Sequence, residues 1–151
     1  VVRIHSKSTT DWTALEAQGE AAVGSLEFVH WNADIDNPAN KRFVADYRKK
    51  FGHMPSAYAE QGYDAAQLID AAVKAVGGKL ADKDGIRRAL RAANIQSPRG
   101  PFKFNRNHFP IHNQYLVEVV RGADKKPTIV STGVVYQNVQ DSHVGKCQMP
   151  N

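Results

Sequence analysis

The sequence has 151 residues, 42% of them hydrophobic, which suits one ordinary domain, and no stretch approaches the roughly 20 apolar residues of a membrane span. Its single cysteine, Cys147, excludes an internal disulfide framework and any Cys-x-x-Cys metal knuckle. The net charge of +5 favours anionic partners, which include nucleic acid, a membrane surface and a carboxylate ligand.

The N-terminal part is predicted to contain two strands. "VVRIHSKS" (1–8) and "SLEFVHW" (25–31) read as strands, and a short helical or turn segment (12–24) lies between them. In the second strand, alternation places Leu26 and Phe28 on one face. The polar stretch "NADIDNPANK" that follows is predicted to be a loop that leads into a helix.

Three helices are predicted next. The first has Asn37 as its cap and Pro38 at the first helical position, where a missing N–H costs nothing, and it ends at Gly52. Ser56 and Asp82 cap the second and third helices. Apolar residues at spacings of three and four mark the inner faces, which are Phe43, Val44, Tyr47 and Phe51; Ala59, Tyr63, Ala66, Ile69, Val73 and Val76; and Ile86, Ala89, Leu90 and Ala93.

From Gly100 onward the pattern becomes that of a β-meander. "GPFKFN", "QYLVEVVRG" and "TIVSTGVVY" are predicted strands, with turns at "RNHFP" and "GADKKP". We therefore expect an α/β fold in which strands before and after the helices belong to one sheet. In such a chain the strands belong to one structural unit and the intervening helices to a second one.

Two histidine and cysteine pairs have the four-residue spacing of metal ligands. They are His108 with His112, and His143 with Cys147. Pro110 lies inside the first pair, so its two histidines are not stacked on one helical face. We favour turn and tail residues in solvent over a metal site, and predict no metal.

Nucleic-acid binding and catalysis have weaker support. The basic segment "KRFVADYRKK" (41–50) could bind phosphates, but it also fits the outer face of an amphipathic helix, with Tyr47 on the apolar stripe. The sequence contains no nucleophile elbow, no phosphate-binding glycine loop and no HExxH pair. We predict no enzyme, no cofactor and no nucleic-acid partner.

"PSAYAEQGYDAA" (55–66) concentrates aromatic and polar residues in the first turns of a predicted helix. A helix N-terminus attracts anions through its open N–H groups and its dipole. Together with these donors, Tyr58 is predicted to form a binding site for a small carboxylate ligand. The alternative is that Tyr58 and Tyr63 only pack on a sheet.

Several blocks together resemble a known family. They include "GEAAVG" before a strand that ends in "HW", then "DNPANKRFVADYRKKFGHMPSAYAEQGYDAAQLIDAAVKAVGG", "SPRGPFKFNRNHFPIHNQYLVEV" and the tail "GKCQMPN". From about Leu15 to Cys147, the chain resembles the C-terminal portion of type I periplasmic solute-binding proteins of ABC transporters. Within the branched-chain amino acid receptor group, it is most similar to members that take up aromatic acids.

The resemblance implies a partial periplasmic-binding-protein-like fold. Such receptors have two α/β lobes joined by three crossovers, and the ligand binds in the cleft between the lobes. By analogy, residues 1–52 belong to the C-terminal lobe and residues 53–104, which are helical, to the N-terminal lobe. Residues 105–140 return to the C-terminal lobe as a β-meander, and residues 141–151 form a tail.

The resemblance also implies a site and partners. Trp31 and Tyr58 are expected to face each other across the cleft as aromatic walls. The full set of predicted ligand contacts is Trp31, Tyr58, Gln61, His30, Asn32 and Tyr63. The implied ligand is a small carboxylate, an aromatic acid in preference to an aliphatic branched-chain amino acid. The implied partner is an ABC permease in the inner membrane, and the implied compartment is the periplasm.

The chain also departs from the family. A full receptor is about twice as long or longer, and the first-lobe sheet with its ligand-anchoring serine and threonine loops has no counterpart here. We expect weak ligand binding by the chain alone, and exposed edges that invite dimerisation or strand exchange. A disulfide partner of Cys147 would lie in the absent part. The competing class is a His/Cys metal-binding module or a basic nucleic-acid-binding module.

Overall fold

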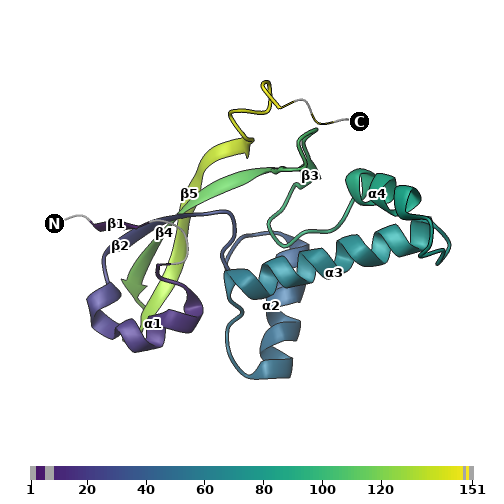
Figure 1. The fold of residues 1–151 in the computed structure, drawn as a ribbon. Coiled ribbons are helices and arrows are strands. Elements are labelled where there is room, and N and C mark those ends of the chain that lie inside the picture. Colours follow the sequence, from purple (N-terminus) through teal and green to yellow (C-terminus); the bar gives the residue numbers. More distant parts are fainter. Residues whose placement is uncertain (1–2, 6–8, 148, 150–151) are drawn as a thin grey trace.

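The fold is a mixed α/β arrangement, shown by a computed structural model that describes residues 3–5, 9–147 and 149 (Figure 1). The remainder of the first predicted strand and part of the tail lie outside the described residues. In chain order the elements are β1 (Arg3–His5), α1 (Trp12–Gln18), the 3-10 turn η1 (Gly19–Ala22), β2 (Ser25–Val29), α2 (Pro38–Phe51), α3 (Ala57–Ala75), α4 (Lys83–Ala92), β3 (Lys103–Phe104), β4 (Pro110–Arg121) and β5 (Pro127–Val139).

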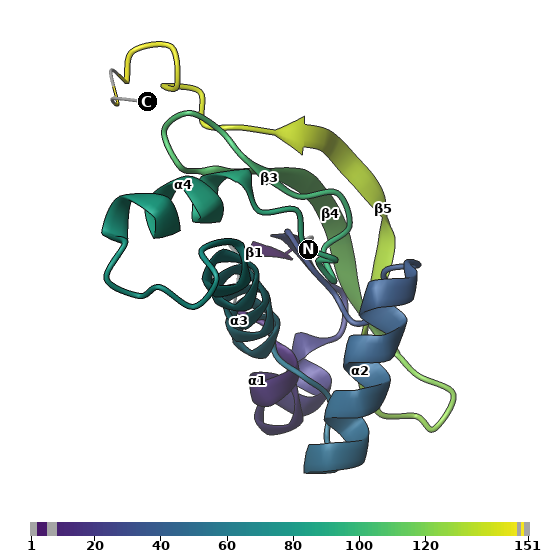
Figure 2. The ribbon, with the colours of Figure 1, turned by 90° about the vertical axis from the view of Figure 1, so that its right-hand side faces the viewer.

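The strands form one five-stranded sheet centred on β4. β1 pairs in parallel with β2, and β2 pairs antiparallel with β4, so that Phe28 lies opposite Leu116. β5 pairs antiparallel along most of β4, and Figure 2 shows it on the outer side of β4, away from α3. The expectation that strands before and after the helices share a sheet is confirmed.

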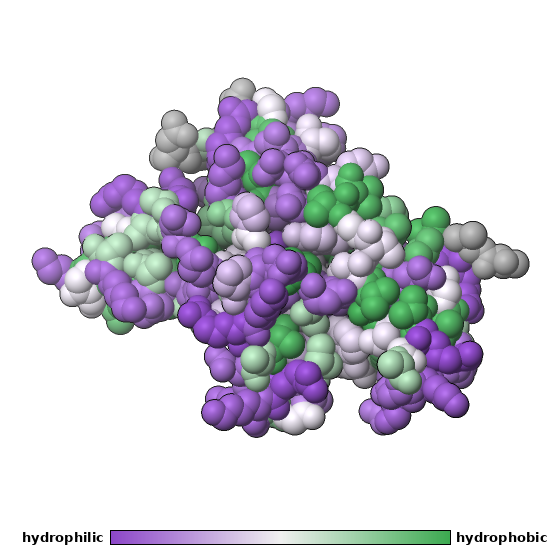
Figure 3. Space-filling model, turned by 180° about the vertical axis from the view of Figure 1, so that it is seen from behind, coloured by the Kyte–Doolittle hydropathy of each residue, from purple (hydrophilic) through white to green (hydrophobic). Residues whose placement is uncertain are grey.

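The core lies between this sheet and the helices α1 and α2. In the second half of β4 every second residue is buried, namely Tyr115, Val117 and Val119, as the two-residue period of a half-buried strand requires. They form one cluster with Leu15 of α1 and Phe43 of α2. Figure 3 shows that the exposed hydrophobic residues on the rear face gather over the sheet half, whereas the surface of the α3–α4 arm is more hydrophilic.

The helices begin where the sequence predicts. The side chain of Asn37 accepts a hydrogen bond from the Asn40 N–H at 2.8 Å, and Ser56 accepts one from Ala59 at 3.1 Å. Gly52 ends α2 in the left-handed conformation, with φ 78°. No helix of the described residues is both long enough and apolar enough to cross a membrane.

The buried face of α3 matches the predicted one only in part, since Ala59 and Tyr63 pack on the core. Ala66 and Ile69 are exposed, Ile69 by 60%, although the apolar spacing places both inward. The helix buries Glu60 and Asp64 instead. Arg99 contacts both acids, so the inward side of α3 carries an ionic interaction with a distant segment.

Candidate functional site

The loop after β2 carries three of the predicted site residues, and buried hydrogen bonds fix its shape. β2 ends at Val29, two residues earlier than predicted. The Trp31 indole N–H donates to Oδ1 of Asn40 at 2.7 Å, and its ring meets Phe43 edge-on at 6.0 Å between centroids. Trp31 is only 3% exposed, so it anchors the loop to α2.

Asn40 is the residue that shapes this loop, and the sequence reasoning did not identify it. It is fully buried, and its amide N–H groups lie 3.0–3.2 Å from the carbonyl oxygens of Asn32, Ala33 and Ile35. The sequence did contain an indication of this role. Asn40 stands three residues before Phe43, on the apolar face of the helix, and a buried polar side chain needs hydrogen-bond partners.

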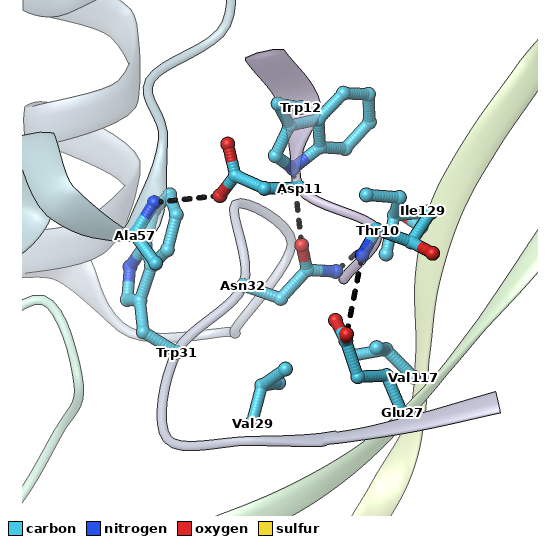
Figure 4. Close-up of a pocket in the computed structure, with 10 residues that line it drawn as sticks. All are labelled: Thr10, Asp11, Trp12, Glu27, Val29, Trp31, Asn32, Ala57, Val117 and Ile129. Carbon is cyan, nitrogen blue, oxygen red and sulfur yellow. Dashed lines mark hydrogen bonds between the residues drawn. The ribbon is translucent and has the colours of Figure 1, made fainter. Parts of the chain in front are cut away.

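Asn32 is likewise engaged by the protein itself. Its side-chain oxygen accepts the indole N–H of Trp12 at 3.1 Å, and its amide nitrogen lies 2.8 Å from Oδ1 of Asp34 (Figure 4). Asp34 accepts in turn from Ser131 on β5, through its N–H at 2.7 Å and its hydroxyl at 2.6 Å. Asn32 therefore ties α1 and β5 to the loop.

A small cavity lies between this loop, α1 and the sheet (Figure 4). It is lined by Thr10, Asp11, Trp12, Glu27, Val29, Trp31, Asn32, Ala57, Val117 and Ile129. Its volume of about 20 Å³ is close to the space of one water molecule, so a ring-sized ligand does not fit. Glu27 accepts the N–H groups of Thr9 and Thr10 at its edge, and burial raises the pKa of Glu27.

The first turn of α3 does not offer the open donors that the sequence suggested. The Ala57 N–H donates to Oδ2 of Asp11 at 3.0 Å, and the Ala59 N–H donates to the Ser56 hydroxyl. Two of the first-turn N–H groups are therefore already bound by side chains of the protein. The Tyr58 side chain projects outward and is 64% exposed.

The structure brings His30 and Gln61 together. The His30 Nε2 lies 3.4 Å from Nε2 of Gln61 and 3.3 Å from Oε2 of Glu60, so the loop after β2 contacts the start of α3. Trp31 and Tyr58 form no ring contact among the described residues, and one is buried while the other is exposed. Tyr63 is half-buried and packs on Phe43 at 4.9 Å between ring centroids.

Beside His30 lies a buried group that we call the α3 ionic cluster, made of His30, Glu60, Asp64, Ser97 and Arg99. The Arg99 Nε lies 2.9 Å from Glu60 and 3.0 Å from Asp64, and the Ser97 hydroxyl donates to Asp64 at 2.6 Å. The two carboxylates are at most 1% exposed. Burial, followed by a hydrogen bond with Glu60, raises the pKa of Asp64 to about 6.

A sequence signal for this cluster did exist. Glu60 and Asp64 stand four residues apart on one helix, where like charges repel unless a cation lies over the same face. An open hollow of about 260 Å³ borders the cluster, and Gln61, Arg99 and Phe102 are among its lining residues. It is far roomier than the cavity at Trp31.

The four candidate metal ligands form no common group among the described residues. His108 lies exposed in a turn with φ 64°, whereas His112 stacks on His30 at 5.6 Å between ring centroids. Cys147 is a half-buried free thiol. Within the described part of the chain, no group of three or more His, Cys, Asp or Glu side chains could hold a metal ion.

Comparison with known proteins gives consistent matches. A family profile described as periplasmic binding protein matches residues 2–126. Leu/Ile/Val-binding protein homolog 6 of Brucella abortus (strain 2308) is 34% identical over 123 residues, which cover 76% of this chain and 30% of that protein. The chain thus spans less than a third of the length of this curated relative.

Two solved structures share the fold. A solute-binding protein of an ABC transporter from R. palustris, in complex with benzoate, is 38% identical with a TM-score of 0.82, and the match covers 93% of this chain and 37% of that one. The solute-binding protein of Rhodopseudomonas palustris BisB5, in complex with 3,4-dihydroxybenzoic acid, is 31% identical with a TM-score of 0.82, over 95% and 39% of the two chains.

Proposed function

This chain belongs to the periplasmic binding protein family of ABC transporters, and on that premise we propose that it is part of a receptor that binds an aromatic carboxylate in the periplasm. The family consists of solute receptors, so the proposed activity is reversible binding without covalent chemistry. The observation that carries the site is the contact between His30 in the loop after β2 and Gln61 on α3.

We assign residues 1–52 and 105–140 to one lobe and residues 53–104 to the other. This division is supported by Figure 1, where α3 and α4 project away from the sheet while β2, β4 and β5 remain within it. The chain crosses between the two parts near residue 53 and again near residue 104. The contact between His30 and Gln61 then joins residues of different lobes.

The proposed ligand contacts come from both sides of this junction. The exposed ring of Tyr58 offers an aromatic face, and the Gln61 amide offers a hydrogen-bond donor for a carboxylate, while the buried His30 contacts Gln61 from behind. Trp31, Asn32 and Tyr63 complete the proposed set as the residues that hold the walls in place. Ligand held between the lobes would favour the closed form, which would dock on a permease.

The aromatic preference draws support from the solved neighbours in complex with benzoate and 3,4-dihydroxybenzoic acid. The curated relatives are named Leu/Ile/Val-binding protein homologs, so an aliphatic amino acid is the second candidate. An aromatic ring suits the open hollow beside Gln61, which Phe102 and Phe104 also line.

A thermal-shift screen of the full-length parent receptor tests this function. Benzoate, 3,4-dihydroxybenzoate and leucine are compared at equal concentrations, because among ligands that bind only the native state the tighter binder raises Tm more. We expect the two benzoates to raise Tm and leucine to have no effect. Stabilisation by leucine alone would contradict the aromatic assignment.

A further inference from the structure

One carboxylate joins the start of α1 to the start of α3. Oδ1 of Asp11 accepts the N–H of Thr13 at 3.0 Å and its hydroxyl at 2.9 Å, which makes Asp11 the N-cap of α1. The second oxygen, Oδ2, accepts the N–H of Ala57, the first residue of α3, at 3.0 Å (Figure 4). Asp11 is only 8% exposed, so water has little access to this bond.

A cap for α3 alone does not require Asp11. The Ser56 hydroxyl already accepts the Ala59 N–H at 3.1 Å, as the N-cap of a helix normally does. The bond from Ala57 is instead a contact between distant segments of the chain. Its carboxylate lies at the positive end of the α3 dipole, where a negative charge is favourable. Asp11 therefore adds a fixed position of the first turn of α3 relative to α1.

A second contact holds the same face of α3. Gln61 stands four residues after Ala57, one helical turn along, and its amide nitrogen lies 3.4 Å from Nε2 of His30. Asp11 precedes α1 and His30 follows β2, so the two contacts reach α3 from different segments. Two attachments one turn apart fix the rotation of a helix as well as its position. The exposed Tyr58 ring lies on the turn between them, so its direction depends on both.

We propose that Asp11 is a positioning residue of the receptor, which holds the first turn of α3 so that Tyr58 faces the ligand. This inference rests on the proposed function, because Tyr58 is a ligand contact only under that proposal. Asp11 acts through Ala57 and the helical turn that follows. The cavity that Asp11 lines at Trp31 is too small for a ring-sized ligand, so direct contact with the ligand is not part of this role.

Variants at position 11 separate this role from the cap of α1. Asn and Ser cap helices about as well as Asp, but each has a single side-chain oxygen. In Asp11→Ser the bonds to Thr13 and Ala57 can therefore no longer form together, and Asp11→Asn replaces this variant if it does not fold. Asp82→Asn is the matched control, since Asp82 caps α4 by accepting the Gly85 N–H at 2.8 Å, within its own helix.

Amide hydrogen exchange of the protein tests the bond without any ligand. In the native protein the Ala57 N–H should exchange more slowly than the Tyr58 N–H, because a first-turn N–H has no acceptor within its own helix. Exchange at Ala57 should become about tenfold faster or more in Asp11→Ser, as expected for the loss of a hydrogen bond to a charged group, and stay unchanged in Asp82→Asn. Equal exchange at Ala57 and Tyr58 in the native protein would overturn the proposal.

A double-mutant cycle in the full-length parent receptor tests the positioning role. Asp11→Ser should weaken benzoate binding by at least about fivefold, measured by isothermal titration, and Asp82→Asn should bind as the native receptor does. Added to Tyr58→Ala, the Asp11→Ser change should cause no further loss, because both remove the same interaction. A general loss of structure would instead weaken binding equally in both backgrounds, and that result would overturn the positioning role.

The same titrations separate this inference from the proposed function. A native receptor that takes up no benzoate would contradict the proposed function. A native receptor that binds benzoate with the same affinity as Asp11→Ser would leave the proposed function intact and overturn the role of Asp11.

Discussion

The indole N–H of Trp31 donates to Oδ1 of Asn40 at 2.7 Å, in a part of the core where both side chains are buried. Through the same amide, Asn40 also holds three backbone carbonyl groups of the loop that follows β2. One side chain of α2 thus determines the path of the segment that carries His30, Trp31 and Asn32. The proposed ligand site depends on this support although Asn40 lies outside it.

Asn40→Ala should destabilise the protein by about 3 kcal/mol, because it leaves the Trp31 N–H and several buried carbonyl groups without partners. Urea unfolding measures the loss as a lower midpoint at an unchanged slope. Asn94→Ala, at an exposed position in the connection after α4, is the control and should be close to neutral. Equal midpoints for the two variants would show that the Asn40 network contributes nothing.

Arg99→Met should destabilise the protein by about 3 kcal/mol at neutral pH, because it leaves two buried carboxylates without their cation. The loss should shrink as the pH falls, since protonated acids need no counter-charge. Arg87→Met removes an exposed ion pair with Asp84 and should cost under about 1 kcal/mol. A loss for Arg99→Met that stays constant down to pH 4 would contradict this account of the cluster.

We predict different roles for two aromatic residues: Trp31 supports the structure, and Tyr58 contacts the ligand. In the full-length parent, Tyr58→Ala should weaken aromatic ligand binding by about tenfold or more and leave Tm unchanged, since this ring is exposed. Trp31→Ala should also weaken binding by about tenfold or more, but with a lower Tm, because it removes a buried ring. Isothermal titration and thermal unfolding measure the two effects.

The control for the binding residue is Tyr136→Ala, a similarly exposed tyrosine on β5. It lies on the outer strand of the sheet and should leave both affinity and Tm unchanged. Unchanged titrations for both Tyr58→Ala and Trp31→Ala would show that the ligand binds elsewhere on the receptor.

Local features of the sequence were sufficient to predict the helices, but not the long-range contacts around the candidate site. Asn37, Ser56 and Asp82 predict their helices correctly because a cap depends on residues within one turn. The inward face of α3 was predicted only in part from apolar spacing, which does not reveal that Asp64 pairs with Arg99, 35 positions away. Contacts of this kind depend on the path of the chain, which residue spacing does not reveal.

Gly62 provides a prediction about the stability of α3. A Cβ built at this position meets no atom of the described residues within 4 Å, so Gly62→Ala should stabilise α3 by roughly 0.5–1 kcal/mol through lower backbone entropy in the unfolded chain. Gly85→Ala is the matched control in α4. Its Cβ would lie 2.1 Å from the Asp82 cap, so this variant should be destabilising. Thermal unfolding measures both changes, and a loss of stability in Gly62→Ala would show that the exposed face of α3 is packed in solution.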